Sequence, residues 1–459
     1  MVDLDRLFNP LSVAVVGASN DVRKTGHRYI TNLAKGSYSG ELYPVNPGES
    51  EILGLTSYQR VTDIPGDVDL AIVTVPARIV PKVISDCSRK GVRFAVVHTA
   101  GFAELGVEGA GLQEQMIEQA QSGGTRIIGP NCMGIYSTQA GINTVAPVPA
   151  TQEDAGTVAF VGQSGWATEN VLGIGYERGL RFGKVVSIGN QSDLTVEDLL
   201  EYFGNDDNTS VIGIYIEGMK RGREFLRIAR EVSRKKAVVV WKAGRSEYGV
   251  RAAMSHTGSI AGDSIAADAA LMQSGVVLAR DLEHLIDLMV GFTSPVLPAG
   301  NRLGLLVEAG GGSVAGSDSA AALGFDLCTL STETQQELIG ILSGVIPPFA
   351  PPRNPVDIVW GPSVNRSSFF LRCSRVIVKE VDALLVVNYR EYDDEFAVGL
   401  AKLRDEVNKT ILIVPGHSFE NRKGMELMTR HGVPSFTIPE RALGTLQSML
   451  RLSRYRSDY

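Results

Sequence analysis

The sequence predicts an α/β protein made of three doubly wound parallel-sheet domains. Short runs of valine, isoleucine and alanine recur along its 459 residues, and many of them end in glycine. Stretches with helical periodicity separate these runs, which is typical of parallel strands covered by helices on both faces of a sheet. The alternation restarts twice after proline-containing segments, at residues 146–156 and 293–302. We therefore expect domains at residues 1–145, 146–295 and 296–459.

The first expected domain has four apolar runs that each end in small residues or proline. The stretches between them are amphipathic, and two of these, 78–91 and 108–124, predict helices. Right-handed crossovers between parallel strands would place a ligand crevice at the carboxyl ends of the strands. The strands are expected within residues 12–19, 69–77, 93–101 and 125–134.

The second and third expected domains repeat this pattern, so all three are flavodoxin-like or Rossmann-like. Helices are predicted at 193–203 and 221–236 in the second domain. Its strands are expected within residues 157–165, 183–190, 211–218 and 237–244. The strands of the third domain are expected within residues 303–312, 383–389 and 410–416, with a last strand at 434–438.

Composition excludes several classes of function. The net charge of −7 is mild and spread along the chain, which argues against a nucleic-acid-binding protein. No apolar run reaches the roughly 18 residues that a membrane span needs, so we expect no membrane partner. The four cysteines have no metal-ligand spacing and suggest no disulfide framework, so we expect no metal site. With no signal-peptide features at the N-terminus, a reducing cytoplasmic location is the simplest interpretation.

Phosphate-binding features follow the first strand. Gly17 closes that strand and a helix follows, an arrangement in which backbone N–H groups and the helix dipole favour a phosphate. The spacing is not G-x-G-x-x-G, and Asn46 and Pro47 stand where an acidic ribose-binding residue would be needed. A nicotinamide cofactor is thus disfavoured and another phosphate-bearing nucleotide is favoured, the alternative being a turn that only packs the helix. Cys132 lies in the same crevice, and we interpret it as a lining residue because no partner nearby would activate it.

Two further helix starts are candidates for receiving an anion. One is formed by Gln163, Ser164 and Gly165, and the other follows the glycines Gly310, Gly311 and Gly312. The first resembles a nucleophile elbow, but its pattern is G-x-S-G and no residues complete a hydrolase triad. Two such helix starts suggest a phosphate that is held at, or passed between, two places.

His256 is the candidate phosphate carrier. It lies in the segment MSHTGSIAG, whose small residues leave the imidazole room to move. Glu217 closes a strand of the same domain, and a carboxylate there would hold one ring nitrogen and leave the other to attack. The alternative is a histidine with a structural or surface role only.

The order of VGAS, VPA, GFAE, GPNCMG, GQSG, IEG and SHTGSIAG resembles the α subunit of the NDP-forming acyl-CoA synthetases. These are the ADP-forming acetate–CoA ligases and, more distantly, succinyl-CoA synthetase. NPVDI at 354–358 also resembles the family. The resemblance implies a Rossmann-like CoA-binding domain, a flavodoxin-like domain that carries a phosphohistidine, and a second flavodoxin-like ligase domain.

The resemblance also implies roles for individual residues. His256 would be phosphorylated, Glu217 would orient it, and the two helix starts named above would receive its phosphate. The residues that fall on coenzyme A binding loops are Gly17, Ala18, Ser19, Asn46, Pro47, Val75, Pro76, Ala77 and Asn131.

The implied reaction converts a carboxylic acid, CoA and ATP into acyl-CoA, ADP and phosphate, through an acyl phosphate and a phosphohistidine. No stretch resembles an ATP-grasp domain, so we expect ATP, ADP and Mg²⁺ to be held by a separate β subunit, in a heterotetramer. Trp166 and the glycine run at 310–312 depart from the commoner family pattern, which leaves the acid open. Trp166 either narrows the acyl pocket or fills the core. A non-catalytic regulatory protein that binds CoA or acyl-CoA is the alternative function.

Overall fold

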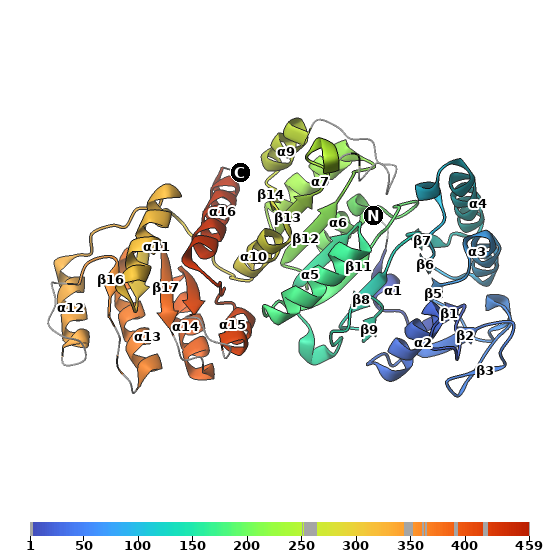
Figure 1. The fold of residues 1–459 in the computed structure, drawn as a ribbon, viewed down its shortest axis with the longest axis horizontal. Coiled ribbons are helices and arrows are strands. Elements are labelled where there is room, and N and C mark those ends of the chain that lie inside the picture. The colour runs from blue at the N-terminus through green and yellow to red at the C-terminus, as the bar shows by residue number, and fades with distance from the viewer. Residues whose placement is uncertain are drawn as a thin grey trace. The chain divides into compact units, whose positions relative to one another are not determined.

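The computed structural model describes residues 3–249, 251, 264–343, 352–359, 362, 365–389, 393–415 and 421–458. Across these residues the chain forms three mainly parallel sheets and one small hairpin of strands β3 (Glu51–Ile52) and β4 (Leu55–Thr56) (Figure 1). This arrangement confirms the predicted fold class. No helix in the described part of the chain combines the length and the apolar character needed to cross a bilayer.

The first sheet has five parallel strands in the order β2-β1-β5-β6-β7. The side chains of β1 are buried along its whole length, which explains why the strand appears in the sequence as a continuous apolar run. The order reverses direction between β1 and β5, so the ligand crevice of this domain is expected there. The strands are β1 Ser12–Val16, β2 Glu41–Val45, β5 Leu70–Val73, β6 Phe94–Val97 and β7 Arg126–Ile128. The helices are α1 Asp5–Phe8, α2 Thr25–Lys35, α3 Val80–Lys90 and α4 Val107–Gly123, with short 3-10 turns η1 Val61–Asp63, η2 Ala77–Ile79 and η3 Ala103–Leu105.

The second sheet has seven strands in the order β14-β13-β12-β10-β11-β8-β9. Its reversal point lies between β10 and β12, and the edge strands β8 and β9 are antiparallel. This sheet begins before the expected boundary at residue 145, because β8 and β9 pair onto its edge. The strands are β8 Gly134–Ser137, β9 Ile142–Asn143, β10 Val158–Gly162, β11 Phe182–Ser187, β12 Val211–Ile216, β13 Ala237–Lys242 and β14 Val277–Leu278. The helices are η4 Gln152–Asp154, α5 Gly165–Glu177, α6 Val196–Asn205, α7 Gly222–Ser233, α9 Ser264–Gln273 and α10 Leu282–Phe292.

The third sheet has four parallel strands in the order β16-β15-β17-β18. The prediction of a last strand at 434–438 is wrong, because within this segment only Ser435 forms a β-bridge, to Ile413 of β18. The strands are β15 Leu303–Val307, β16 Val356–Asp357, β17 Ala383–Tyr389 and β18 Thr410–Pro415. The helices are α11 Gly310–Ala322, α12 Thr332–Leu342, α13 Arg366–Ile377, η5 Val378–Glu380, α14 Asp394–Val407, α15 Asn421–Arg430 and α16 Pro439–Ser457.

The chain packs as two compact units. The first contains residues up to Ile174 and Arg181–Leu285, with the first two sheets, and the second contains Gly175–Leu180 and Ile286–Tyr459. The later turns of α10 belong to the second unit, where Asp287 accepts hydrogen bonds from Arg178 and Arg441. The second unit thus begins before the expected boundary at residue 296.

Candidate active site

The crevice of the first sheet is shaped by two glycines that touch. Gly17 follows β1 with a φ of +91°, which favours glycine, and Gly26 lies in the first turn of α2. A Cβ atom at Gly26 would lie 1.8 Å from the carbonyl oxygen of Gly17. Only glycine therefore lets the N-terminus of α2 approach the end of β1 this closely, and the first N–H groups of a helix lack partners one turn earlier in the helix. The arrangement fits a phosphate group at this point.

A cavity of ≈ 810 Å³ opens at the same place. Of the residues expected to bind coenzyme A, the cavity is lined by Gly17, Asn46, Pro47, Val75 and Pro76. It is also lined by four cationic side chains that sequence reasoning missed: Arg23, Lys24, Arg60 and Lys82. Arg23 and Lys24 could have been predicted from the sequence, because they directly precede the start of α2. Arg60 and Lys82 follow different strands, and only the order of the sheet brings them together.

The other residues expected to bind coenzyme A support the crevice and are not among those that line it. Ala18 and Ser19 are buried, and the Ser19 hydroxyl donates to Glu49 over 2.9 Å. The Asn46 side chain, which does line the cavity, also donates to the carbonyl of Ala18 over 2.8 Å and so ties the ends of β1 and β2 together. The remaining two residues lie nearby: Ala77 begins the 3-10 turn η2, and Asn131 has a φ of 59° and donates its backbone N–H to Thr99.

Cys132 is a buried structural residue. Its thiol lies 3.4 Å from the carbonyl oxygen of Val97, and burial raises the pKa of the thiol to about 12. Such a group stays protonated at neutral pH and is a poor nucleophile. The neighbouring His98 lies with its Nδ1 2.7 Å from the Cys132 carbonyl oxygen, and burial lowers the pKa of this imidazole.

Gln163 and Glu217 meet at the reversal point of the second sheet, where β10 and β12 end side by side. The side-chain oxygen of Gln163 accepts hydrogen bonds from the backbone N–H groups of Glu217, over 2.8 Å, and Gly218, over 3.2 Å. The backbone N–H of Gln163 donates to the carbonyl of Tyr215 over 3.0 Å. This corrects one expectation: the N–H of Gln163 continues the sheet and is not free to receive an anion. Helix α5 begins at Gly165, and the preceding Ser164 accepts from the N–H of Thr168 in its first turn, so these two residues do form a helix start as expected.

Glu217 carries the most informative side chain of this site. It is half-buried, and its Oε1 accepts a hydrogen bond of 3.3 Å from the Tyr215 hydroxyl. Burial raises the pKa of Tyr215, which keeps its hydroxyl protonated. The second oxygen, Oε2, is buried and has no hydrogen-bond partner in the part of the chain that the structure describes. Burying a carboxylate oxygen without a hydrogen-bond donor costs free energy. We therefore expect one more donor at this position. His256 lies outside the described residues.

The chain matches two families of known domains. Residues 11–138 match the CoA binding domain family, and residues 155–292 match the succinyl-CoA ligase like flavodoxin domain family. The chain is 38% identical to the acetate–CoA ligase [ADP-forming] II subunit alpha of Pyrococcus furiosus, over 95% of each chain. It is 34% identical to the I subunit alpha of the same organism, over 100% of this chain and 99% of that one.

A solved structure matches the whole chain as well. It is the dinucleotide forming acetyl-coenzyme A synthetase 1 of Ca. Korarchaeum cryptofilum in complex with phosphate and ADP. The match has a TM-score of 0.86 and 36% identity, and covers 100% of this chain and 98% of that chain. The chain belongs to the ADP-forming acetate–CoA ligase family. Its members are ligases, so the alternative of a non-catalytic CoA-binding protein is not favoured.

The third domain of this family member also presents a helix start at a strand end. Helix α11 begins at Gly310, directly after β15, and nothing lies within 4 Å of a Cβ built on Gly311. Gly312, by contrast, donates its N–H to the carbonyl of Ala309 within the first turn. The expectation that this N–H is free to receive an anion is therefore wrong. A Cβ on Gly310 would lie 3.3 Å from the carboxylate of Asp357, so a negative charge already lies beside this helix start.

Two further expectations concern the side chain of Trp166 and the presence of a metal site. Trp166, the second residue of α5, is 60% exposed, so the alternative that it fills the core is wrong. Among the described residues, no group of three or more histidine, cysteine, aspartate or glutamate side chains is arranged to hold a metal ion.

Proposed function

We propose that this chain carries the CoA-dependent and phosphohistidine steps of an ADP-forming acyl-CoA synthetase. The first domain binds coenzyme A, the second carries the phosphorylated His256, and the third contributes a further helix start at Gly310 and Gly311. The observation that carries the proposal is Glu217 at the reversal point of the second sheet, with one buried oxygen that has no donor among the described residues. An imidazole N–H is a donor of the right kind.

The cavity of the first domain supports coenzyme A as the ligand. Coenzyme A combines a phosphorylated nucleotide with a long, uncharged pantetheine arm. The cationic residues Arg23, Lys24, Arg60 and Lys82 and the start of α2 suit the phosphates. The backbone turn at Val75 and Pro76 suits the arm, because it presents apolar atoms at the carboxyl end of β5.

The chemistry divides one exchange into two displacements. In the direction that consumes the thioester, a phosphate oxygen attacks the acyl carbon, the carbon–sulfur bond breaks, and coenzyme A leaves as the thiol. A ring nitrogen of His256 then attacks phosphorus in the acyl phosphate, the phosphorus–oxygen bond to the acyl group breaks, and the carboxylate leaves. Glu217 holds the proton of the other ring nitrogen and stabilises the positive charge that develops on the ring.

The helix start at Ser164 and Gly165 supports the second displacement. Its N–H groups and dipole favour the negative charge on the transferring phosphoryl group. Because phosphoryl transfer depends mainly on positioning and charge stabilisation, a carboxylate, an imidazole and a helix start are sufficient on this side of the reaction.

A partner subunit completes the proposed reaction. The Pyrococcus furiosus relatives are named as alpha subunits, which supports a second chain. We assign to it an ATP-grasp fold, the binding of ATP, ADP and Mg²⁺, and a place in a heterotetramer. The small carboxylic acid, phosphate and coenzyme A are then the ligands of this chain. We place the enzyme in the cytoplasm, since the four cysteines are free thiols.

The test is phosphorylation of the full-length chain by acetyl-CoA and inorganic phosphate. We expect one acid-labile phosphoryl group on His256, detected by intact mass, and none in His256→Ala. Glu217→Gln should slow phosphorylation by roughly 10⁴-fold, the scale of the loss when a carboxylate that orients a catalytic histidine is replaced by its amide. Full ATP synthesis by His256→Ala with the partner subunit would exclude the phosphocarrier role.

A further inference from the structure

A buried glutamine, Gln191, contacts the loop that carries Glu217. Its side chain is 2% exposed, and its Nε2 donates to the carbonyl of Gly218 over 3.3 Å. Its Oε1 accepts from the backbone N–H of Val196, the first residue of α6, over 3.0 Å. Since both ends of the amide are bonded, the orientation of this side chain is determined, with its oxygen toward the helix start and its nitrogen toward Gly218.

Gln163 and Gln191 together hold three consecutive peptides at the end of β12. Gln163 accepts from the N–H groups of Glu217 and Gly218, whereas Gln191 donates to the carbonyl of Gly218. The buried Gln163 thus anchors the peptide groups on both sides of the Glu217 Cα, and the buried Gln191 anchors the next one, between Gly218 and Met219. This arrangement leaves the backbone of Glu217 little freedom to rotate.

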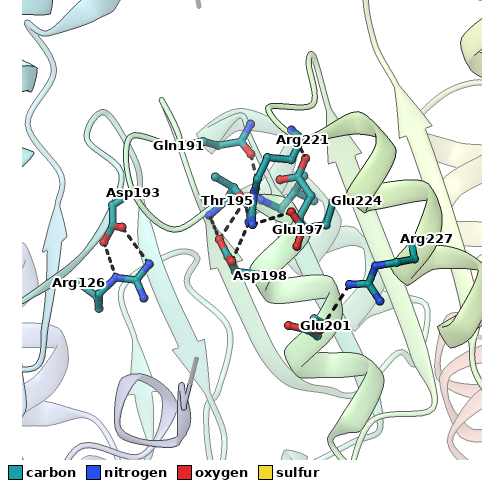
Figure 2. Close-up of polar contacts among 11 residues, drawn as sticks. Arg126, Gln191, Asp193, Thr195, Glu197, Asp198, Glu201, Arg221, Glu224 and Arg227 are labelled. Atoms are coloured by element: carbon teal, nitrogen blue, oxygen red, sulfur yellow. Dashed lines mark hydrogen bonds and ion pairs between the residues drawn. The ribbon is translucent and has the colours of Figure 1, made fainter. Parts of the chain in front are cut away.

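The far end of the same loop is anchored as well. The backbone N–H of Arg221 donates to the fully buried Glu197 over 2.8 Å. The guanidinium of Arg221 pairs with Asp198 at 2.7 Å and donates to Thr195 at 2.8 Å, over the first turn of α6 (Figure 2). The loop from Glu217 to Arg221 is therefore attached to α6 at one end and to Gln191, just before α6, at the other.

The segment that presents Gln191 is itself built onto the first domain. Asp193 pairs with Arg126, the first residue of β7 (Figure 2), and accepts from the N–H of Ile127, the next residue of that strand. Asn190 donates to Glu104 over 2.6 Å, and the N–H of Ser192 donates to the carbonyl of Gly129. Gln191 itself has a φ of 51°, a left-handed conformation that the surrounding bonds maintain.

We propose that Gln191 is a positioning residue for Glu217: by holding the Gly218 carbonyl it fixes the peptide between Gly218 and Met219, and so keeps the Glu217 carboxylate in the position from which it acts on the phosphorylated histidine. The proposal rests on the proposed function, because it assigns Gln191 an effect only through Glu217. It also implies that the CoA-binding domain sets the position of Glu217, since Gln191 is held by the segment that packs on β7. Gln191 contacts no reacting atom and is not itself a catalytic residue.

The main test is Gln191→Glu. The oxygen that faces Val196 is retained, but a carboxylate oxygen replaces the donor opposite the Gly218 carbonyl. We expect the single-turnover rate of phosphorylation by acetyl-CoA and phosphate to fall about tenfold or more, with little change in the acetyl-CoA concentration that gives half of the maximal rate. The rate relative to the parent should recover as the pH falls, because the introduced carboxyl can donate to Gly218 again once it is protonated.

Gln335→Glu is a matched control. Gln335 makes the same kind of bond in the second compact unit, from its Nε2 to the carbonyl of Leu330 over 2.8 Å. The same chemical change there should leave the phosphorylation rate unaltered. If Gln191→Glu fails to fold, Gln191→Asn takes its place, since asparagine tolerates the left-handed conformation but is too short to reach both partners.

A double-mutant cycle separates this inference from the proposed function. In a Glu217→Gln background, Gln191→Glu should cause no further loss of rate. If Glu217→Gln alone leaves the rate unchanged, the role of Glu217 in the proposed function is wrong. If Glu217→Gln slows the reaction but the loss from Gln191→Glu is absent, or simply multiplies with it, the positioning role is overturned while the proposed function stands.

Discussion

Replacing Gly26 by alanine should weaken coenzyme A binding by distorting the start of α2. The added Cβ would lie 1.8 Å from the carbonyl oxygen and 2.6 Å from the carbonyl carbon of Gly17. Non-bonded carbon contacts are comfortable only at about 3.5 Å or more, so the helix start has to move by more than ~1 Å. Overpacking of this kind costs about 1–3 kcal/mol.

Part of that cost should appear as lost affinity. Moving the N-terminus of α2 away from Gly17 separates its N–H groups from the place where a phosphate would lie, an interaction of about 1 kcal/mol. Together with the altered shape of the cavity, we expect the Kd for CoA to rise about tenfold, which corresponds to about 1.4 kcal/mol. Isothermal titration calorimetry of the full chain with CoA measures this directly.

Gly111→Ala is the matched control for this experiment. Gly111 lies in α4 of the same domain, and a Cβ there would meet nothing within 4 Å. Alanine should be neutral or stabilise the helix by up to about 1 kcal/mol, with no change in CoA affinity. If Gly26→Ala binds CoA as tightly as Gly111→Ala, the contact between Gly26 and Gly17 does not shape the CoA site and the reasoning is refuted.

Three other changes test separate parts of the structure. Arg60→Gln should weaken binding of CoA but not of pantetheine, which has no phosphate. The fold should persist, because Asp86, the partner of Arg60, still pairs with Arg89. Equal losses of affinity for both ligands would contradict a phosphate contact. Burial raises the pKa of Glu104, but hydrogen bonds from Asn190, Gly101 and Phe102 outweigh the effect of burial and hold this pKa below the ordinary value of 4.5. The ionised Glu104 therefore stabilises the fold at neutral pH, and this stabilisation is lost on acidification. In Glu104→Gln, the melting temperature should therefore decrease less than in the parent protein below about pH 4.5. If the two proteins show the same dependence on pH, Glu104 does not contribute to acid sensitivity. Cys132→Ala should keep at least about half of the phosphorylation rate, since a buried thiol with a raised pKa is not a nucleophile, and loss of all activity in a folded variant would show otherwise.

The sequence was sufficient for the features that depend on local pattern. Continuous apolar runs ending in glycine marked most of the described parallel strands, because strands buried on both faces need apolar side chains at every position. Gly17, Gly165 and Gly310 were correctly placed where a strand passes into a helix, since such turns need either a left-handed φ or an open backbone. In the three mainly parallel sheets, the strands that the sequence did not mark were the five-residue β2, the two-residue β14 and β16, and β8 and β9, which extend the second sheet. Residues 434–438, which it did mark, form only a single bridge.

The tertiary structure decided which of these ends share a site. Periodicity gives no information about strand order, and only the order β12-β10 brings Glu217 beside Gln163. In the same way, the order β2-β1-β5 brings Arg60 and Lys82 to one cavity. The use of individual polar groups also depends on neighbours distant in sequence: the N–H of Gln163 is taken up by Tyr215, and the amide of Gln191 reaches Gly218 across 27 residues. From the sequence alone, Gln191 was an ordinary loop residue, because a hydrogen bond between distant segments leaves no local pattern to recognise.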